Sequence, residues 1–242
     1  MHREYHNWYS HRLQRHMELL IFGHSGKAVL FFPPRMGRFY DYENWGIIHA
    51  LYDRINNGEL QVFCVDSIDT ESFYNAGVHP ATRIHRHLQY EQYILHEVLP
   101  LIYAKNSSGY LEVAGCSMGA YHAINLAFKY PWLFKKAVGM SGRYDLTHAF
   151  WHFKDIFDGY HSPDIYFNMP LEYVPNLRDE YFLNTMRHME IIMAIGSQDT
   201  FLNHNQKLSE ELWHKAVPNQ LYIWEGEAHK PRYWRQMVRL YL

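Results

Sequence analysis

The stretch VAGCSMGAYHA, residues 113–123, decides the fold, because Ser117 lies between Gly115 and Gly119 in the pattern Gly-x-Ser-x-Gly. The apolar run YLEVA at 110–114 precedes it and apolar residues at helical spacing follow it, so the pattern predicts a strand entering the motif and a helix leaving it. Such a sharp turn strains the serine backbone, and side chains two residues away on either side would collide, which favours glycine at both places. We therefore predict that Ser117 is a nucleophile rather than a small residue in a loop.

Two other serines lie beside glycines but lack this spacing. Ser25, in GHSGK, lies between two apolar runs with no helix after it, and we interpret its segment as a hairpin turn. It is not a phosphate-binding loop, because the G-x-x-x-x-G-K-[ST] spacing is absent. Ser141, in GMSGR, is interpreted as structural.

Apolar runs and helical patterns alternate along the whole chain. The strands are expected within 18–22, 28–32, 60–65, 110–114, 136–141, 189–199 and 221–229. The helices are expected at 45–56, at 82–103, from Ser117 to Tyr130, at about 205–216 and from Pro231 onward. This alternation predicts an α/β fold with a mostly parallel, twisted sheet and helices on both faces, with the first two strands as an antiparallel edge.

The chain of 242 residues is expected to form one domain over 1–242. Residues 145–188 break the alternation, since they are rich in aromatic residues, Asp and Pro and contain no obvious strand. Loops of this length are often functional. We expect an irregular or helical insertion near the pocket, covering it as a small lid, and no large cap domain.

Composition narrows the class of protein. Hydrophobic residues make up 48% and charged residues 20% of the chain, with a net charge of −2, which is ordinary for a soluble protein and points away from nucleic acid. The N-terminus is charged and histidine-rich where a secretory signal needs an apolar segment, and no run is long enough to span a bilayer. A cytoplasmic location and no membrane partner are therefore expected, and a homo-oligomer is left open. Cys64 and Cys116 are expected to be free thiols.

A serine hydroxyl needs a positioned base, and the base needs an orienting acid. In doubly wound hydrolases these groups follow in the order Ser, Asp or Glu, His, each after the carboxyl end of a strand. The order selects Asp199, in GSQDT, and His229, in GEAHK. Asp199 could instead be a helix-capping residue, and Asp145, in SGRYDL, is the second candidate for the acid.

Other histidines are less suitable as the base. His122, His204 and His214 fall within expected helices, so they are interpreted as structural or solvent-facing. This interpretation leaves His229 as the predicted base.

An oxyanion hole needs two backbone N–H groups aimed at the developing negative charge. The first is expected from Met118, directly after the nucleophile. The second is expected from FFPPRMG at 31–37, where proline has no N–H and Arg35 is the first available donor. Met36 is the neighbouring alternative.

These motifs resemble the putative-esterase branch of the α/β-hydrolase superfamily, which includes esterase D-type S-formylglutathione hydrolases, feruloyl and acetyl-xylan esterases and mycolyl transferases. The resemblance covers most of the chain and rests on four segments: VLFFPPRMGRFYDYENWGI, GCSMGAYHAINLAFKYPWLFKKAVGMSGRYDL, GSQDTFL and GEAHKPRYW. It implies a Ser117, Asp199 and His229 triad, with the backbones of Arg35 and Met118 in the oxyanion hole. Two places depart from the pattern: His229-Lys230-Pro231 replaces the His-Asp-Trp of many relatives, and Pro33-Pro34 stands where relatives often have small or acidic residues.

The sequence therefore predicts a carboxylic ester hydrolase acting through an acyl-enzyme, on short-chain acyl or small aromatic esters. No cofactor and no metal are expected, and the expected partner is a small-molecule ester. Two alternatives stay open: an acyltransferase of the same fold, in which an alcohol replaces water, and a non-catalytic binding protein on a hydrolase scaffold.

Overall fold

The computed structural model describes residues 1–150 and 152–242, and its strands form one eight-stranded sheet in the order β1-β2-β4-β3-β5-β6-β7-β8. The strands are β1 (Arg3–Ser10), β2 (Arg15–Phe22), β3 (Lys27–Phe32), β4 (Leu60–Val65), β5 (Leu111–Cys116), β6 (Lys136–Met140), β7 (Glu190–Gly196) and β8 (Gln220–Trp224). Neighbours from β4 to β8 pair in parallel, whereas β1 with β2 and β2 with β4 pair antiparallel. The predicted fold class, a mostly parallel sheet with an antiparallel N-terminal edge, is confirmed.

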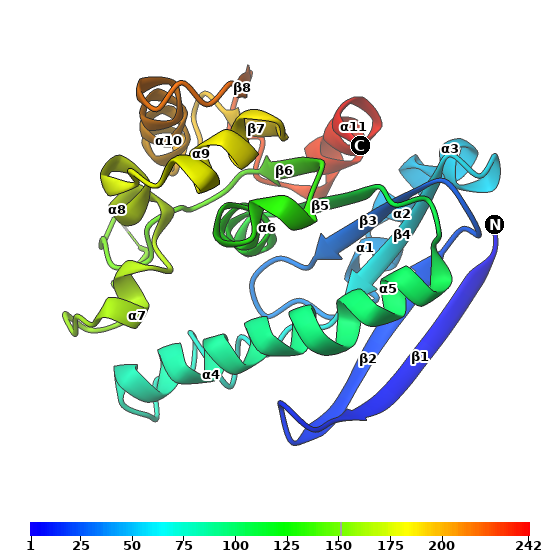
Figure 1. Cartoon of the computed structure of the whole chain (residues 1–242), viewed down its shortest axis with the longest axis horizontal. Helices are drawn as coiled ribbons and strands as arrows, with labels where there is room; N and C mark the ends of the chain where they lie inside the picture. Colours follow the sequence, from blue (N-terminus) through cyan, green and yellow to red (C-terminus); the bar gives the residue numbers. More distant parts are fainter. Residues whose placement is uncertain (151) are drawn as a thin grey trace.

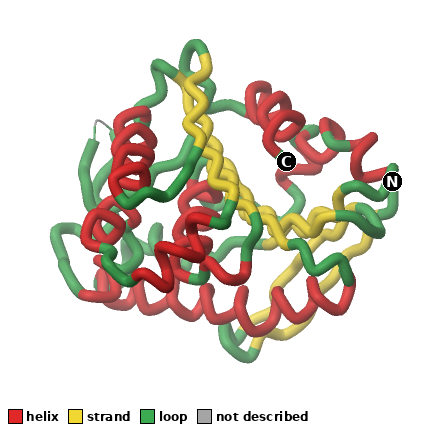
Figure 2. The backbone as a smooth tube through the Cα atoms, turned by 45° about the horizontal axis from the view of Figure 1, so that its top comes forward, coloured by secondary structure: helices red, strands yellow, loops and turns green. Residues whose placement is uncertain are grey.

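Helices cover both faces of the twisted sheet (Figures 1 and 2). One face carries α1 (Asp41–Asn44), α2 (Ile47–Ala50), α3 (Tyr52–Asn56) and α11 (Pro231–Tyr241). The other carries α4 (Pro80–Tyr93), the π-helix η1 (Ile94–Val98), α5 (Leu99–Lys105), α6 (Met118–Lys129) and α10 (Leu202–His214). Short connecting elements are η2 (Pro131–Leu133), α7 (Pro163–Tyr166), α8 (Pro170–Tyr173), η3 (Val174–Asn176) and α9 (Glu180–Arg187).

The alternation of side chains along the central strands separates two cores. In β3, Leu30 and Phe32 pack into the cluster beneath α4 to α6, while Val29 and Phe31 pack into the cluster beneath α2 and α11. All four side chains are buried. A strand buried on both faces reads as a continuous apolar run, which explains why the central strands were predictable from sequence.

The predicted hairpin between 18–22 and 28–32 is wrong, because β4 lies between β2 and β3 and hydrogen-bonds to both. The four residues 23–26 cross two strand spacings, about 10 Å, which is within the reach of four extended residues. Ser25 is thus in a crossover loop, where its hydroxyl donates to the carbonyl of Gly58. The antiparallel edge is formed by β1 and β2 instead. The strand β1 was not predicted, because its many polar residues show no clear apolar alternation in the sequence.

Two predicted helices are interrupted. The segment 82–103 is α4, then one π-helical turn, then α5. Pro100 explains this break, because proline lacks an N–H and its ring clashes with the carbonyl four residues earlier, which a wider turn relieves. The segment 45–56 contains two short helices, α2 and α3.

The insertion 145–188 contains short helices and loops, and residue 151 within it lies outside the described residues. It is anchored by an apolar cluster that joins it to α4 and α6: Phe73, Ile84, Met118, Tyr121, Leu146, Ile156, Phe157, Ile165 and Met169. This cluster fixes the start of the insertion beside the N-terminus of α6.

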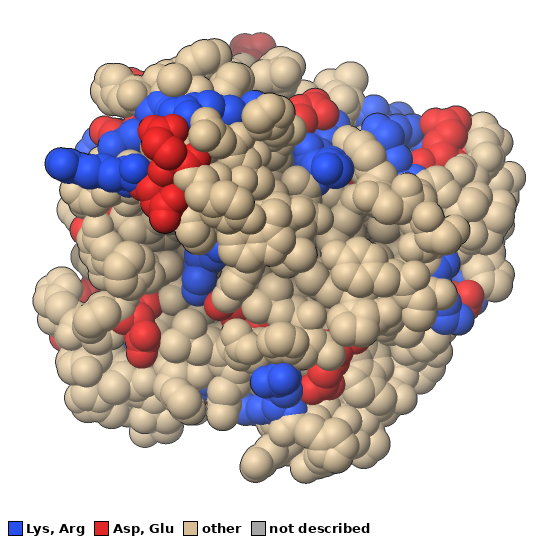
Figure 3. Space-filling model, viewed as in Figure 1, with Lys and Arg blue, Asp and Glu red and all other residues tan. Residues whose placement is uncertain are grey.

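The surface face seen in Figure 3 carries basic and acidic side chains in small mixed groups, separated by uncharged surface. In the described part of the chain, no helix combines the length and apolar character needed to cross a membrane.

Candidate active site

Ser117 stands on a sharp turn between β5 and α6, with a positive φ of 57° and ψ of −117°. Its N–H donates to the carbonyl of Met140 at 2.7 Å, which ties the turn to β6. A Cβ on Gly115 would lie 2.2 Å from the carbonyl carbon of Gly119, and a Cβ on Gly119 would lie 2.1 Å from the carbonyl oxygen of Phe32. Both glycines are therefore required by close backbone approach.

A chain of two hydrogen bonds connects Ser117 to His229 and Asp199. The Oγ of Ser117 lies 2.9 Å from Nε2 of His229, and Nδ1 of His229 lies 2.8 Å from Oδ2 of Asp199. Asp199 follows β7 and His229 follows β8, so the carboxyl ends of parallel strands bring the three residues to one edge of the sheet. The other oxygen of Asp199 accepts the N–H of Phe201 at 3.0 Å, and the carboxylate is buried.

Asp145, the alternative acid, is turned away from this chain. Its Oδ1 accepts the N–H and the hydroxyl of Thr147 at 2.8 and 2.7 Å. His204 lies in α10, where it accepts the N–H of Tyr144 through Nδ1 at 3.3 Å, and burial lowers its pKa to about 4. Asp199 thus contacts the imidazole of His229, whereas the side chain of Asp145 stabilises a local turn at Thr147.

Arg35 and Met118 both line the cavity that contains Ser117. Met118 is the first residue of α6, where backbone N–H groups have no intrahelical acceptor. Met36 is excluded as the second donor, because its N–H is already bonded to Oδ2 of Asp69 at 2.9 Å. The N–H of Arg35 has no acceptor among the described residues.

Asp69, which sequence reasoning missed, therefore holds the loop that carries Arg35. It is buried, and its other oxygen lies 3.3 Å from Nε2 of His122 on α6. Its position shortly after β4, at the same edge of the sheet as the other site residues, is the signal that could have found it.

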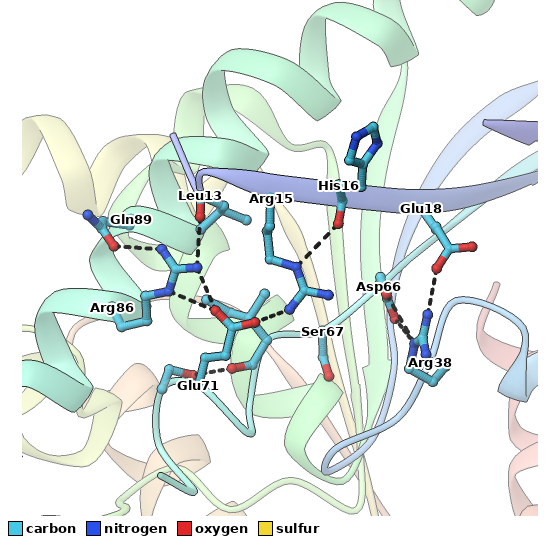
Figure 4. A network of polar contacts seen from close by, with 12 residues as sticks. Leu13, Arg15, His16, Glu18, Arg38, Asp66, Ser67, Glu71, Arg86 and Gln89 are labelled. Carbon is cyan, nitrogen blue, oxygen red and sulfur yellow. Dashed lines mark hydrogen bonds and ion pairs between the residues drawn. The ribbon is translucent and has the colours of Figure 1, made fainter. Parts of the chain in front are cut away.

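A network of ion pairs fixes the segment 66–72 that contains Asp69 (Figure 4). Asp66 accepts from Nε of Arg38 at 2.8 Å, and burial raises the pKa of this carboxyl. Glu71 is held by Arg15 and by Arg86, whose Nη2 lies 2.6 Å from Oε2. These contacts join the segment to β2, to α4 and to the loop after β3.

Tyr42, on α1, connects the loop after β3 to the serine turn. Its hydroxyl donates to the carbonyl of Phe32 at 2.7 Å and accepts the N–H of Cys116 at 2.9 Å, while its ring stacks on Phe31 with centroids 3.9 Å apart. Cys116 and Cys64 are free thiols, as predicted, and both are buried. Burial raises the pKa of the Cys116 thiol, so it stays protonated and is no rival nucleophile.

The loop that carries His229 is held from the other side. Trp234 donates from Nε1 to Oγ of Ser141 at 3.1 Å, and this hydroxyl in turn donates to the carbonyl of Ala228 at 3.3 Å. The Trp234 ring meets the His229 ring edge to face at 5.7 Å. Ser141 is therefore structural, as predicted, and it supports the turn just before the imidazole.

The cavity at Ser117 has a volume of about 310 Å³ and is mostly apolar. It is lined by Pro34, Arg35, Trp45, Tyr74, Ser117, Met118, Arg143, Phe153, Phe201, His229 and Trp234. Among the described residues, no group of three or more His, Cys, Asp or Glu side chains is arranged to hold a metal ion.

Solved structures with the same fold include several hydrolases. A ferulic acid esterase is 16% identical with a TM-score of 0.79, covering 99% of this chain and 95% of its own. The S-formylglutathione hydrolase FrmB of Staphylococcus aureus is 18% identical with a TM-score of 0.71, covering 99% and 97%. FphF, a fluorophosphonate-binding serine hydrolase of Staphylococcus aureus, is 19% identical with a TM-score of 0.73, covering 99% and 96%. No curated protein matches the chain in sequence.

The fold is that of the α/β-hydrolases, and the class of protein is the serine esterases. The family model described as "Putative esterase" matches residues 38–236, and the chain belongs to this family. Membership agrees with the resemblance inferred from the motifs around Ser117 and His229.

Proposed function

We propose that the protein hydrolyses carboxylic esters through an acyl-enzyme on Ser117. His229 takes the hydroxyl proton as Oγ attacks the ester carbonyl, and it returns this proton to the leaving alcohol. Water then attacks the acyl-enzyme with the same base, releasing the acid. Asp199 orients the imidazole and stabilises its protonated form.

The observation that carries this proposal is the continuous hydrogen-bond chain of 2.9 and 2.8 Å from Ser117 through His229 to Asp199. Three loops far apart in sequence converge to make it, which a merely structural serine turn does not require. The N–H groups of Met118 and Arg35 are proposed to stabilise the negative oxygen of the tetrahedral intermediate.

The cavity supports small substrates. A volume of about 310 Å³ is near the lower end of ordinary ligand pockets, and its walls include Trp45, Phe153, Phe201 and Trp234. We propose that the substrates are short-chain acyl or small aromatic esters. We also propose that the chain forms a single domain, whose insertion at 145–188 covers the cavity through its first turn.

Hydrolysis of 4-nitrophenyl acetate and butyrate by the wild type and Ser117→Ala tests the proposal. Loss of the nucleophile should lower kcat by roughly 10⁶-fold, as in other serine hydrolases. Ser25→Ala is the matched control, because Ser25 is also flanked by glycines but lies in the loop 23–26. A fluorophosphonate probe should add its mass to Ser117 alone, and an equal rate in Ser117→Ala would refute the mechanism.

A further inference from the structure

Arg143, in the loop after β6, is a buried cation that makes no ion pair with a carboxylate among the described residues. Only 6% of the residue is exposed. Its Nε donates to the carbonyl of Asp145 at 3.0 Å, and its Nη2 donates to the carbonyls of Leu146, His148 and Lys154 at 3.3, 2.8 and 2.9 Å. In the described part of the chain, no carboxylate lies within ion-pair distance of the guanidinium, and Nη1 has no acceptor.

A buried charge is costly unless an opposite charge compensates it. Burial lowers the pKa of Arg143 and outweighs the carboxylates of Asp145 and Asp155, which favour the charged guanidinium from a distance. Asp145 bonds to Thr147 through Oδ1 and makes no ion pair with Arg143. The guanidinium lies beside the rings of Phe153 and Phe201, with centroids 5.9 and 5.7 Å away, and these aromatic faces compensate only part of the charge. The mechanism at Ser117 gives this cation no role.

Arg143 lines two adjoining cavities. The first contains Ser117, and the second has a volume of about 400 Å³. The two share the lining residues Arg35, Tyr74, Arg143 and Phe153, so they meet at these side chains.

The second cavity has an excess of positive charge. Its lining contains the cations Arg35, Arg83, Arg143 and Lys154 and the acids Asp155 and Asp158. Arg83 is neutralised by Asp158 at 2.8 Å. Asp155 accepts the N–H groups of Phe157 and Gly159 at 2.7 and 2.6 Å. Arg35 and Lys154 have no ion-pair partner among the described residues.

We infer that the second cavity binds an oxyanion group of the substrate, held by Arg143 with Arg35 and Lys154, while the ester carbonyl lies at Ser117. This inference rests on the proposed function and names its substrate class: esters that carry a carboxylate or similar oxyanion on the acyl or the alcohol side. A guanidinium with a free N–H and two further cations suit an oxyanion, because charge-assisted hydrogen bonds are about twice as strong as neutral ones.

Two matched substrate pairs test the inference and locate the anion. 4-Nitrophenyl monoadipate against 4-nitrophenyl methyl adipate places the charge on the acyl side. 4-Carboxyphenyl hexanoate against its methyl ester places the charge on the alcohol side. One of the two pairs should show at least about a 10-fold higher kcat/KM for the anionic member, and this preference should fall with added salt.

Variants assign the preference to the named cations. Arg143→Gln should abolish it, and Lys154→Gln and Arg35→Gln should each lower it about 3-fold to 10-fold. The latter two keep the test valid if Arg143→Gln fails to fold. Because the preference is a ratio within one matched pair, a change in the overall rate of Arg35→Gln does not affect it. Lys135→Gln is the control, because Lys135 is an exposed lysine just before β6, at the opposite edge of the sheet.

Calorimetric titration of Ser117→Ala with the four uncleaved esters separates this inference from the proposed function. Tighter binding of one anionic ester than of its neutral partner supports the oxyanion site even if hydrolysis fails. Equal kcat/KM and equal affinity within both pairs would overturn it. In that case, hydrolysis of the neutral esters by wild type but not by Ser117→Ala would leave the proposed function intact.

Discussion

The N–H of Met36 donates to the buried carboxylate of Asp69 across 2.9 Å, and this bond ties the loop after β3 to the segment after β4. Met36 has a positive φ of 53°, so the loop after β3 turns back on itself directly after Arg35. The bond occupies the N–H of Met36, whereas the N–H of Arg35 has no acceptor among the described residues, which supports Arg35 as the second donor of the proposed oxyanion hole.

Asp69→Ala should lower kcat for a neutral ester by about 10-fold to 100-fold with little change in KM, because the Arg35 N–H loses its alignment. Removal of an oxyanion donor itself costs about 10²-fold to 10³-fold, so misalignment should cost less. Asp69→Asn keeps an acceptor oxygen and should recover most of the rate. Steady-state kinetics and the affinity for a trifluoromethyl ketone analogue check this prediction. A change in KM with no loss of kcat would argue for a different role of Asp69.

Asp199→Asn should lower kcat by about 10⁴-fold, because an amide favours the wrong imidazole tautomer at His229. Asp145→Asn should change kcat by less than about 10-fold, since the hydrogen bonds of its side chain to the described residues all go to Thr147. Rates of 4-nitrophenyl butyrate hydrolysis by both variants decide between the two acids. The reverse ranking would reassign the acid to Asp145.

Gly119→Ala should lower both stability and activity, because its Cβ would lie 2.1 Å from the carbonyl oxygen of Phe32. We expect a loss of about 1–3 kcal/mol in the free energy of unfolding and at least about 10²-fold in kcat, since the start of α6 must shift. Urea denaturation and kinetics measure the two effects. Gly77→Ala is the control, because its nearest neighbour would be 3.4 Å away, and an equal loss there would contradict the argument.

Acid should destabilise the protein through His204. Burial lowers its folded-state pKa to about 4, below the value of about 6.5 in the unfolded chain. The unfolded state therefore binds more protons between these values, and stability is lost as the pH falls from about 6.5 to about 4, by about 3 kcal/mol in total. Below that range the contribution is flat.

His204→Gln offers an uncharged acceptor to the N–H of Tyr144 and should reduce this slope. Urea denaturation of the wild type and variant at pH 4.5, 5.5 and 7 measures it. The burial of His87 lowers its pKa as well, so part of the slope should remain. An unchanged slope in His204→Gln would exclude His204 as a source.

The central sheet was predictable because its strands are buried on both faces and read as continuous apolar runs, as in β4 and β7. The edge was not, because β1 is half exposed and polar, and because strand neighbours are set by pairing across the sheet rather than by order along the chain. For this reason β4, and not β3, lies beside β2. Pro100 is present in the sequence, but only the structure shows that the helix widens into a π-helical turn just before it.

By itself, the sequence determined the serine turn and the candidates for the acid and the base. Gly115, Ser117 and Gly119 are a local requirement of backbone geometry, and Asp199 and His229 follow strands whose carboxyl ends must share one edge. Only the tertiary structure shows that Asp199 rather than Asp145 contacts His229, that the N–H of Met36 rather than that of Arg35 bonds to Asp69, and what surrounds Arg143. These outcomes depend on contacts between residues far apart in the chain, such as the 2.9 Å bond from Met36 to Asp69, and no local pattern encodes such contacts.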